Sequence, residues 1–407
     1  MTGRWVGIWT AAPQAADPGD LPPPPFTADG LVFRGSTLRQ TVKVSAGARR
    51  IRLRISNAFG AAALRVARVG VALPGGGQAG VSGIEPGTSR AVTFAGRPAG
   101  VAAAGGHVVS DPVDFPVAVG ASVTVTMYLA EGLRVAGGVT AHPGSRTTSY
   151  LTDGDHVTDL RLPRAVPVDH WYLLDAVESG SAAAAAVILG DSLTDGRGSA
   201  TNGNDRWPDQ LLDLMHARGE AGGVVLLNQG IGGNRVLTGG LGPTVLARLD
   251  RDALAVAGVQ WLVIFAGLND IGATDATDAA QRQVAAELRA AYEQIAAKAR
   301  AAGIAVYGAT LTPFGGNHPY DDPAGHREAA RQAVNAWIRV GRGFDAVLDF
   351  DRAVRDPRDP RKVRAALDSG DHLHLNPAGY RALAGAVPAG FFRPNPSPAD
   401  RTRNGPP

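Results

Sequence analysis

The hydrophobic pattern of this chain changes near residue 180, and that change most restricts its fold. Before it, short stretches alternate apolar and polar residues and are separated by Gly, Pro, Asn and Asp. After it, short apolar runs alternate with amphipathic stretches of helical length. The first pattern is typical of antiparallel strands, and the second is typical of a parallel sheet covered by helices. The sequence therefore predicts two domains, with a boundary at 178–183 and a flexible tail at 393–407.

The first domain, 1–178, is predicted to be all-β. Residues 50–55 alternate Arg with Ile or Leu, so that the apolar side chains would face a core and the arginines would face water. Residues 123–129 repeat this alternation. Since many short strands separated by turns are typical of sandwiches and jelly rolls, we expect one of these two architectures.

The second domain, 184–392, is predicted to be a doubly wound α/β fold. Its longest helix candidate begins at Asp278, the expected N-cap, and ends at Ala302, with Gly303 as its stop. The strand candidates are 185–189, 224–227, 261–265, 304–309 and 346–348. Such a chain of alternating strands and helices favours a parallel sheet with helices on both faces.

Composition excludes several function classes. The chain of 407 residues has no cysteine, so it forms no disulfide, no thiolate metal site and no cysteine nucleophile. Its net charge is only +3 and its basic residues are dispersed, which argues against a nucleic-acid partner. The longest apolar run, 182–189, is far shorter than the roughly 20 residues of a membrane span. We expect a soluble protein, secreted or periplasmic if a signal peptide has been removed and cytoplasmic otherwise.

Polar motifs follow the first three predicted strands of the second domain. Gly-Asp-Ser-Leu stands at 190–193, Asn-Gln-Gly-Ile-Gly-Gly-Asn at 228–234 and Gly-Leu-Asn-Asp at 267–270, while Asp-His-Leu-His at 371–374 precedes the last helix. Ligands of open α/β sheets bind at the carboxyl ends of the strands. The motifs would therefore bring together a hydroxyl, glycine N–H groups, a carboxamide, and a carboxylate three residues from an imidazole.

This set of groups suits nucleophilic catalysis by a serine. A serine hydroxyl needs a base to take its proton, and the base needs a third group that orients it, roles that Ser192, His374 and Asp371 can fill. Because residues i and i+3 of a turn are neighbours, Asp371 can reach one ring nitrogen of His374 and leave the other for Ser192. The N–H groups of Ser192 and Gly233 and the Asn269 carboxamide can then stabilise an oxyanion.

The four motifs resemble those of the SGNH, or GDSL, hydrolase family, and the resemblance covers the second domain. It implies a flavodoxin-like three-layer α/β/α fold, a catalytic triad of Ser192, His374 and Asp371, and an oxyanion hole formed by Ser192, Gly233 and Asn269. The chemistry of such a triad needs no cofactor, and we expect no metal ion. The first domain resembles the β module that precedes the hydrolase domain in a bacterial subgroup of this family.

The resemblance restricts the reaction more than the substrate, since the family includes carboxylesterases, lipases, lysophospholipases and carbohydrate deacetylases. We predict a serine ester hydrolase that acts on short-chain acyl esters through an acyl-enzyme. Two alternatives remain: a carbohydrate O-acetyl esterase acting on acetylated polysaccharide, and a non-catalytic glycan-binding protein. The partner is thus a small-molecule or carbohydrate ester, and the sequence leaves the oligomeric state open.

Some motif residues also have purely structural interpretations. Gly233 can be a glycine that the loop backbone requires, a purpose that Gly230 or Gly232 can also serve. Asn269 can stabilise its loop instead of an oxyanion. Asp191 is expected to hold the loop of Ser192 by a hydrogen bond rather than to bind a cation.

Other histidines and aromatic residues outside the motifs need an assignment. In an extended segment His372 and His374 would point the same way, but a zinc site would need further ligands, so we disfavour a metal pair. His318 and His326 lie in a loop rich in Gly and Pro that is expected to line or cover the cleft. Four aromatic residues are expected in core or interdomain packing rather than in a sugar platform: Trp5, Trp9, Trp171 and Tyr172.

Overall fold

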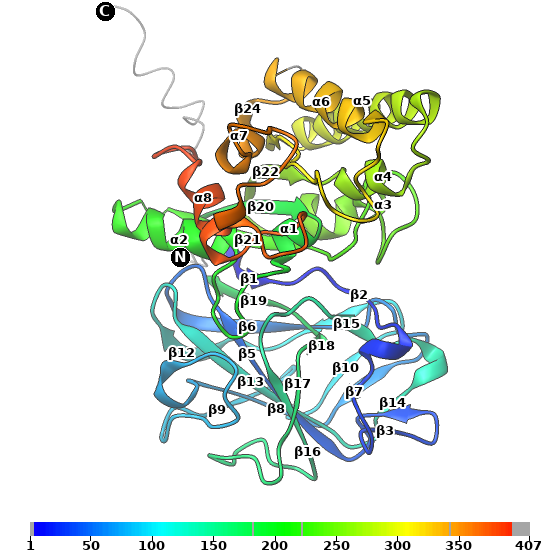
Figure 1. Cartoon of the computed structure of the whole chain (residues 1–407). Coiled ribbons are helices and arrows are strands. Elements are labelled where there is room, and N and C mark those ends of the chain that lie inside the picture. The colour runs from blue at the N-terminus through cyan, green and yellow to red at the C-terminus, as the bar shows by residue number, and fades with distance from the viewer. Residues whose placement is uncertain (1–3, 181–182, 221–222, 342, 393–407) are drawn as a thin grey trace, which may run out of the picture.

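The computed structural model of the chain describes residues 4–180, 183–220, 223–341 and 343–392. Figure 1 shows a β-rich part below and a part with both helices and strands above. Both predicted fold classes are confirmed. Strand β19 runs to Gly180, two residues beyond the limit expected for the first domain. The tail expected at 393–407 lies outside the described residues.

The α/β domain has a parallel sheet of five strands in the order β21-β20-β22-β23-β24. Numbered along the chain, this is the order 2-1-3-4-5 of flavodoxin-like folds, whose ligand crevice lies at the switch point between the first and third strands. That crevice is therefore expected between β20 and β22. The strands are β20 (Ala184–Gly190), β21 (Val224–Gly230), β22 (Val259–Phe265), β23 (Ala305–Ala309) and β24 (Ala346–Leu348).

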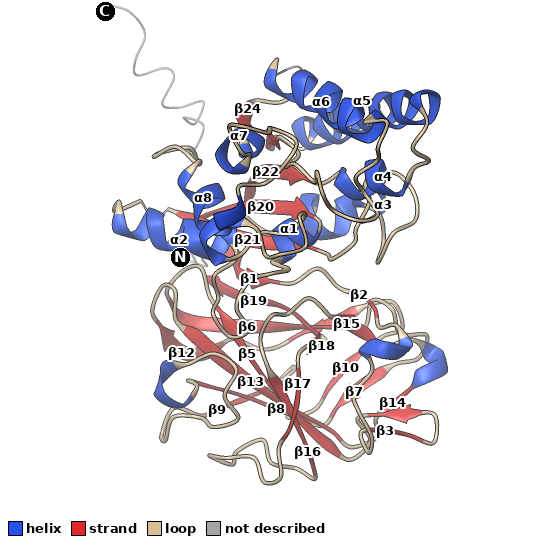
Figure 2. Ribbon diagram, in the orientation of Figure 1, coloured by secondary structure: helices blue, strands red, loops and turns tan. Residues whose placement is uncertain are grey.

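Helices cover both faces of this sheet (Figure 2). On one side α2 (Trp207–Ala217), α7 (Phe350–Val354) and α8 (Pro377–Gly385) pack together, and on the other α5 (Asp278–Ala301) packs on α6 (His326–Arg339). The shorter helices are α1 (Ser192–Asp195), α3 (Val245–Leu249), α4 (Leu268–Ala273), the π-helical turn η4 (Asp250–Leu254) and the 3-10 turn η5 (Ala365–Leu367).

The ends of α5 test the sequence prediction for the longest helix. The N-cap is Thr277, whose hydroxyl accepts the N–H of Ala280, so the expected N-cap Asp278 is instead the first helical residue. The helix ends where Gly303 adopts a φ of +76°, as predicted. A threonine directly before an aspartate offers two capping side chains, and the sequence alone did not distinguish them.

The β domain consists of antiparallel sheets. The first large sheet holds β1 (Trp5–Thr10), β6 (Ala48–Ser56), β11 (His107–Val109), β12 (Val113–Val117) and β19 (Leu174–Gly180). The second holds β5 (Ser36–Lys43), β8 (Arg68–Ala72), β9 (Arg90–Val92), β13 (Ser122–Leu129), β16 (Ser149–Asp153) and β17 (Val166–Val168).

Smaller pairings complete the β domain. They join β7 (Leu64–Val66) to β10 (Gly100–Ala102), β4 (Leu31–Val32) to β3 (Thr27–Ala28) and β14 (Leu133–Arg134), and β15 (Thr140–His142) to β2 (Gln14–Ala15) and β18 (Trp171–Tyr172). The 3-10 turns are η1 (Pro18–Asp20), η2 (Gly75–Gly77) and η3 (Val135–Gly137).

Strand β6 confirms the alternation only for its apolar residues. Ile51, Leu53 and Ile55 are fully buried. The arginines between them differ from the prediction, because Arg52 and Arg54 are mostly buried and form ion pairs with carboxylates of the neighbouring strand β19. A charged residue on the second face of a strand is thus not necessarily in water when the next strand supplies its counter-ion.

The predicted packing role of the aromatic residues is confirmed for Trp9 and Trp171. Both are buried, and their rings meet edge to face with centroids 5.0 Å apart. Tyr172 is fully buried, and Trp5 is covered by the guanidinium of Arg52 at 4.5 Å. These rings therefore stabilise the β domain.

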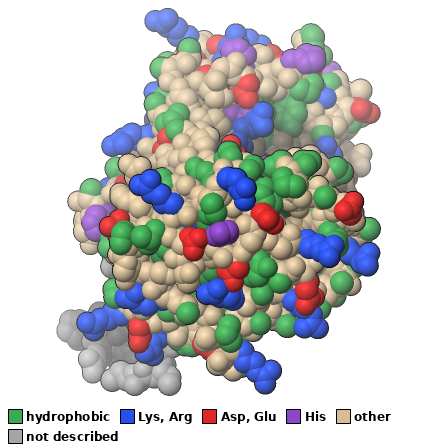
Figure 3. Space-filling view, turned by 90° about the horizontal axis from the view of Figure 1, so that it is seen from below, with side chains coloured by type: hydrophobic (Ala, Val, Ile, Leu, Met, Phe, Trp, Pro, Cys, Tyr) green, Lys and Arg blue, Asp and Glu red, His purple; other side chains and the backbone are tan. Residues whose placement is uncertain are grey.

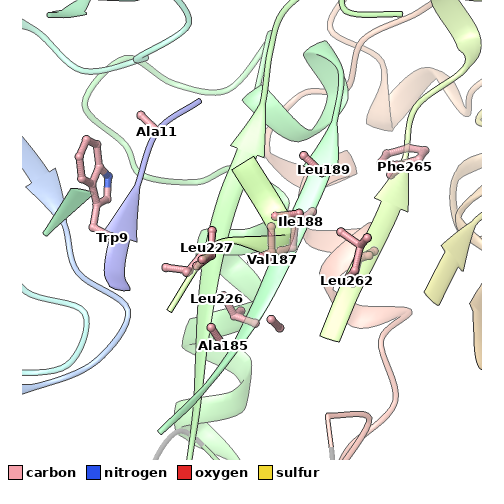
Figure 4. Packing of buried hydrophobic residues seen from close by; sticks show 14 of the residues in the cluster. Trp9, Ala11, Ala185, Val187, Ile188, Leu189, Leu226, Leu227, Leu262 and Phe265 are labelled. Atoms are coloured by element: carbon pink, nitrogen blue, oxygen red, sulfur yellow. The ribbon is translucent and has the colours of Figure 1, made fainter. Parts of the chain in front are cut away.

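The two domains share one hydrophobic cluster. Strand β1 packs against β21, and Figure 4 shows Trp9 and Ala11 on the side of β21 that carries Leu227. A Cβ atom at Gly7 would lie 3.2 Å from the side chain of Leu227, so this side chain packs directly on the backbone of β1. The domain contact is therefore part of the core.

The surface carries charges of both signs. In the view of Figure 3, Lys and Arg are interspersed with Asp and Glu, and no stripe of one sign crosses this face. None of the described helices is both long and apolar enough to cross a membrane.

Candidate active site

Ser192 lies at the carboxyl end of β20, at the switch point of the sheet. Asp191 caps α1 by accepting the N–H of Leu193 at 3.0 Å, so Ser192 is the first helical residue. Asp191 therefore has the loop-holding role expected from the sequence. Its complete burial raises the pKa of the carboxyl to about 7, although the hydrogen bond from Leu193 opposes the shift.

The structure brings Ser192, His374 and Asp371 into one hydrogen-bonded chain. Ser192 Oγ lies 2.8 Å from His374 Nε2, and His374 Nδ1 lies 2.6 Å from Asp371 Oδ2. The second oxygen of Asp371 accepts the N–H groups of Leu373 and His374, which fixes the carboxylate. A carboxylate at Nδ1 keeps a proton on that nitrogen and leaves Nε2 free to accept the serine proton.

The electrostatics of the site favour a neutral His374 and an ionised Asp371 in this hydrogen-bonded row of residues. Burial lowers the pKa of His374 below 6.5, Asp371 opposes this, and the positive charges of Arg197 and Arg146 add to the lowering. Burial raises the pKa of Asp371, but the hydrogen bonds from His374 outweigh it and bring the value to about 2. Near neutral pH the imidazole is thus neutral and the carboxylate is ionised.

Two backbone N–H groups are available beside Ser192 Oγ. The N–H groups of Ser192 and Gly233 donate to no group within the described part of the chain. The N–H of Gly232 is bound to the carboxylate of Asp195 at 2.9 Å, so Gly232 cannot donate to a substrate. Gly233 has a φ of +66°, which explains the glycine there, whereas Gly230 is needed because a Cβ atom would lie 2.3 Å from the backbone of α1.

The carboxamide of Asn269 is held in a defined orientation at the same cleft. Its Oδ1 accepts the hydroxyl of Tyr320 at 2.6 Å, and its Nδ2 donates to the carbonyl of Asn234 at 2.9 Å. An amide nitrogen has two hydrogens, so one remains for a ligand. Asn269 therefore has both a loop-stabilising bond and a free donor.

Residues 188–382 match the model of the GDSL-like lipase/acylhydrolase family. The α/β domain belongs to this family. The protein is therefore an ester hydrolase with a GDSL domain, in agreement with the family resemblance of its motifs.

Solved structures of bacterial proteins are similar to part of this chain. A GDSL-like lipase from Bacteroides thetaiotaomicron is 18% identical, with a TM-score of 0.36, and the match covers 50% of this chain and 85% of that one. An acetylxylan esterase from Geobacillus stearothermophilus is 22% identical, with a TM-score of 0.37, and the match covers 50% of this chain and 93% of that one. No curated protein matches the sequence.

The cleft of the GDSL domain has a volume of about 340 Å³ and is also lined from the β domain. Sequence reasoning missed four of its polar residues. Arg197, Asn317 and Tyr320 belong to the GDSL domain, and Arg146 belongs to the β domain. Arg197 stands five residues after Ser192, and this spacing could have indicated from the sequence that it lies near the cleft. The place of Arg146 in the cleft depends on how the two domains pack and could not be predicted.

The remaining histidines differ in their positions. His318 lines the cleft, as predicted, whereas His326 begins α6 and lines a separate pocket. His372 has a φ of +61°, so its segment is not extended, and its ring is bound to Asp368 at 2.7 Å. Among the described residues no group of three or more His, Asp or Glu could hold a metal ion.

Proposed function

We propose that this protein is a serine carboxylesterase for short acyl groups, with Ser192 as the nucleophile. The observation that supports the proposal is the pair of hydrogen bonds, 2.6 and 2.8 Å long, that links Asp371 through His374 to the hydroxyl of Ser192. That hydroxyl lies beside two free N–H groups and one carboxamide in a cleft. This is the arrangement that acyl transfer requires.

In the acylation step, His374 Nε2 takes the proton of Ser192 as Oγ attacks the ester carbonyl carbon. The carbonyl oxygen becomes an oxyanion that accepts hydrogen bonds from the N–H groups of Ser192 and Gly233 and from Asn269 Nδ2. Asp371 stabilises the imidazolium. When the tetrahedral intermediate collapses, the ester C–O bond breaks and the alcohol leaves with the proton from His374.

In the deacylation step, water takes the place of the alcohol. His374 removes a proton from the water, whose oxygen attacks the acyl-enzyme carbonyl, and the same donors stabilise the second oxyanion. Collapse breaks the bond to Ser192 Oγ, which takes the proton back from His374. The acid is released and the enzyme returns to its starting state, so no cofactor is consumed.

The lining of the cleft supports short acyl groups. Its apolar side chains are few: Leu241, Pro319 and Leu373. Each buried methylene contributes about 0.8 kcal/mol only where an apolar surface covers it. A long acyl chain would find little such surface in a cleft lined mainly by Arg, Asn, His, Gly and Ser, so longer chains are expected to gain no affinity.

The test is hydrolysis of a series of p-nitrophenyl esters of increasing acyl length by wild type and by Ser192→Ala. Ser199→Ala is the matched control, because Ser199 lies in the following loop and does not line the cleft. We expect turnover that falls with acyl length, is abolished in Ser192→Ala and persists in Ser199→Ala. Turnover that survives in Ser192→Ala, with the fold intact by circular dichroism, would sink the proposal.

Two additional measurements separate the alternatives. Acetate release from acetylated xylan, dependent on Ser192, would assign the protein as a carbohydrate O-acetyl esterase. Labelling by an organophosphate, located at Ser192 by mass spectrometry, is expected for the proposed nucleophile. A protein that only binds glycans would not be labelled there.

A further inference from the structure

Two arginines line the cleft beside Ser192 and come from different domains. Arg146 belongs to the loop after β15, and Arg197 follows α1. Neither guanidinium forms an ion pair or a hydrogen bond with another described residue.

Hydrogen bonds between the two domains hold the backbone around Arg146 in position. Its φ is +50°, a conformation that costs energy for any residue other than glycine. Its carbonyl accepts the N–H of Asn202, whose side-chain oxygen accepts the N–H of Thr148 at 2.7 Å. Arg206 donates to the carbonyl of the preceding residue, Ser145. Arg146 is thus fastened to the GDSL domain by its neighbours, and strain of this kind is typical of functional positions.

The guanidinium of Arg146 also has a buried donor without a partner. Its Nε is inaccessible to solvent and has no hydrogen-bond partner within the protein. Buried donors are nearly always satisfied in folded proteins, and exceptions are enriched at functional sites. No acceptor of the described protein thus uses the hydrogen-bonding capacity of this guanidinium.

The cleft provides one carboxylate against these two positive charges. Asp371 is the one carboxylate among the described lining residues. Its oxygens are taken up by His374 Nδ1, by the N–H groups of Leu373 and His374 and by the hydroxyl of Ser369. With two guanidinium groups against this one carboxylate, the lining of the pocket beside the nucleophile has an excess of positive charge, which attracts anionic ligands.

We propose that the ester substrate carries an anionic group close to the scissile bond, and that Arg146 and Arg197 bind this group. The planar guanidinium donates two parallel hydrogen bonds to a carboxylate or a phosphate, which gives orientation as well as affinity. This inference rests on the proposed function, since it places the anion beside the ester that Ser192 attacks. It makes the β domain a part of the substrate site.

The test compares pairs of esters that differ only in one charge. The carboxylate lies on the acyl side in p-nitrophenyl hydrogen adipate, whose neutral partner is its methyl ester. It lies on the alcohol side in 4-acetoxybenzoate, whose neutral partner is methyl 4-acetoxybenzoate. The readout is the ratio of kcat/KM for the charged and the neutral ester, compared between enzyme variants so that intrinsic reactivity cancels.

We expect Arg146→Gln to lower this ratio about tenfold or more in one of the two pairs, because each bond to a charged group contributes that much. Arg197→Gln should lower it in the same pair, by less, because Arg197 is exposed. High ionic strength should reduce the wild-type ratio. Arg134→Gln is the control, since Arg134 is an exposed β-domain arginine that does not line the cleft.

Ratios that are the same in wild type and both variants, for both ester pairs, would overturn the inference. If Arg146→Gln fails to fold, Arg197→Gln decides the outcome alone. The proposed function and the anion site can fail separately. Loss of Ser192 dependence with the neutral esters would overturn the proposed function, whereas Ser192-dependent hydrolysis without an effect of the arginines would overturn only the anion site.

Discussion

His142 Nε2 lies 2.9 Å from Asp195 Oδ1, so a histidine of the β domain holds a carboxylate three residues beyond Ser192. The other ring nitrogen of His142 is bound to the carbonyl of Ala12 at 3.0 Å. The second oxygen of Asp195 accepts the N–H of Gly232, next to the oxyanion donor proposed at Gly233. All of these side chains are buried. The β domain therefore supports the loop that carries the proposed oxyanion donor Gly233.

Replacing His142 should impair catalysis, although His142 does not line the cleft. His142→Phe leaves the Asp195 carboxylate without its partner, and the loop of Gly232 is then expected to shift. A misplacement of about 1 Å at a reacting group costs about a hundredfold in rate, so we expect kcat to fall by about that factor while KM changes little. Steady-state kinetics with a neutral p-nitrophenyl ester measures both constants.

Two further variants test whether His142 acts by positioning. His142→Gln retains a donor and should recover part of kcat. His156 is a second described β-domain histidine that pairs with an aspartate, since its Nδ1 lies 2.7 Å from Asp159. This pair is partly exposed and lies outside the cleft, so His156→Phe should leave kcat unchanged. Equal losses of kcat in His142→Phe and His156→Phe would contradict a specific role for His142.

Asp371→Asn should lower kcat by about three to four orders of magnitude, because the amide can hold His374 in the wrong tautomer. The sequence contains a natural control three residues away on the same turn. Asp368 binds His372 Nδ1 at 2.7 Å, much as Asp371 binds His374. Asp368→Asn should keep most of the activity. A comparable loss in both variants would show that folding of the turn, and not the triad, is affected.

The pH dependence of kcat/KM should follow His374. The base must be neutral, so activity is full above its pKa and falls as the pH drops below it. Because burial, Arg197 and Arg146 lower this pKa, the midpoint should lie below 6.5. Arg197→Gln removes a positive charge, which raises the pKa of His374 and moves the midpoint to higher pH. A pH–rate profile with a neutral ester measures the shift, Arg134→Gln should show none, and a midpoint that moves to lower pH would refute the assignment.

The α/β domain was largely predictable because its signals are local. The apolar runs identify all five strands of the sheet, and the main error is at β21, which continues from Leu227 to Gly230. The added residues Asn228 and Gln229 are polar, so a search for apolar runs stops before them, but they still pair with Ile188 and Leu189 of β20. The backbone pairing of β21 with β20 thus continues past the last apolar residue of β21.

The β domain and its part in the site were predictable only in class. Strand β1 pairs with β19, from the far end of the domain, so Trp5 lies opposite Gly180. No short-range pattern specifies such a pairing. His142 ends β15 and Arg146 follows it, so their contacts with the GDSL domain depend on how the two domains pack. The proposed triad instead lies in short motifs, of which the Ser192 motif follows a strand and the Asp371–His374 motif precedes the last helix.

A buried charge cluster should control the stability of the GDSL domain. Asp351 in α7 is fully buried and forms ion pairs with three arginines: Arg331, Arg339 and Arg355. Arg331 in α6 is itself fully buried, so the cluster joins helices of the two sheet faces. Asp351→Ala leaves Arg331 with Glu328 alone, and breaking a buried pair from one side costs about 3–5 kcal/mol. The free energy of unfolding from urea titration should fall by that amount. Asp359→Ala is the control, because it removes a partner of the exposed Arg361 and should have little effect on the free energy of unfolding. An equally small effect of Asp351→Ala would mean that water replaces the lost carboxylate.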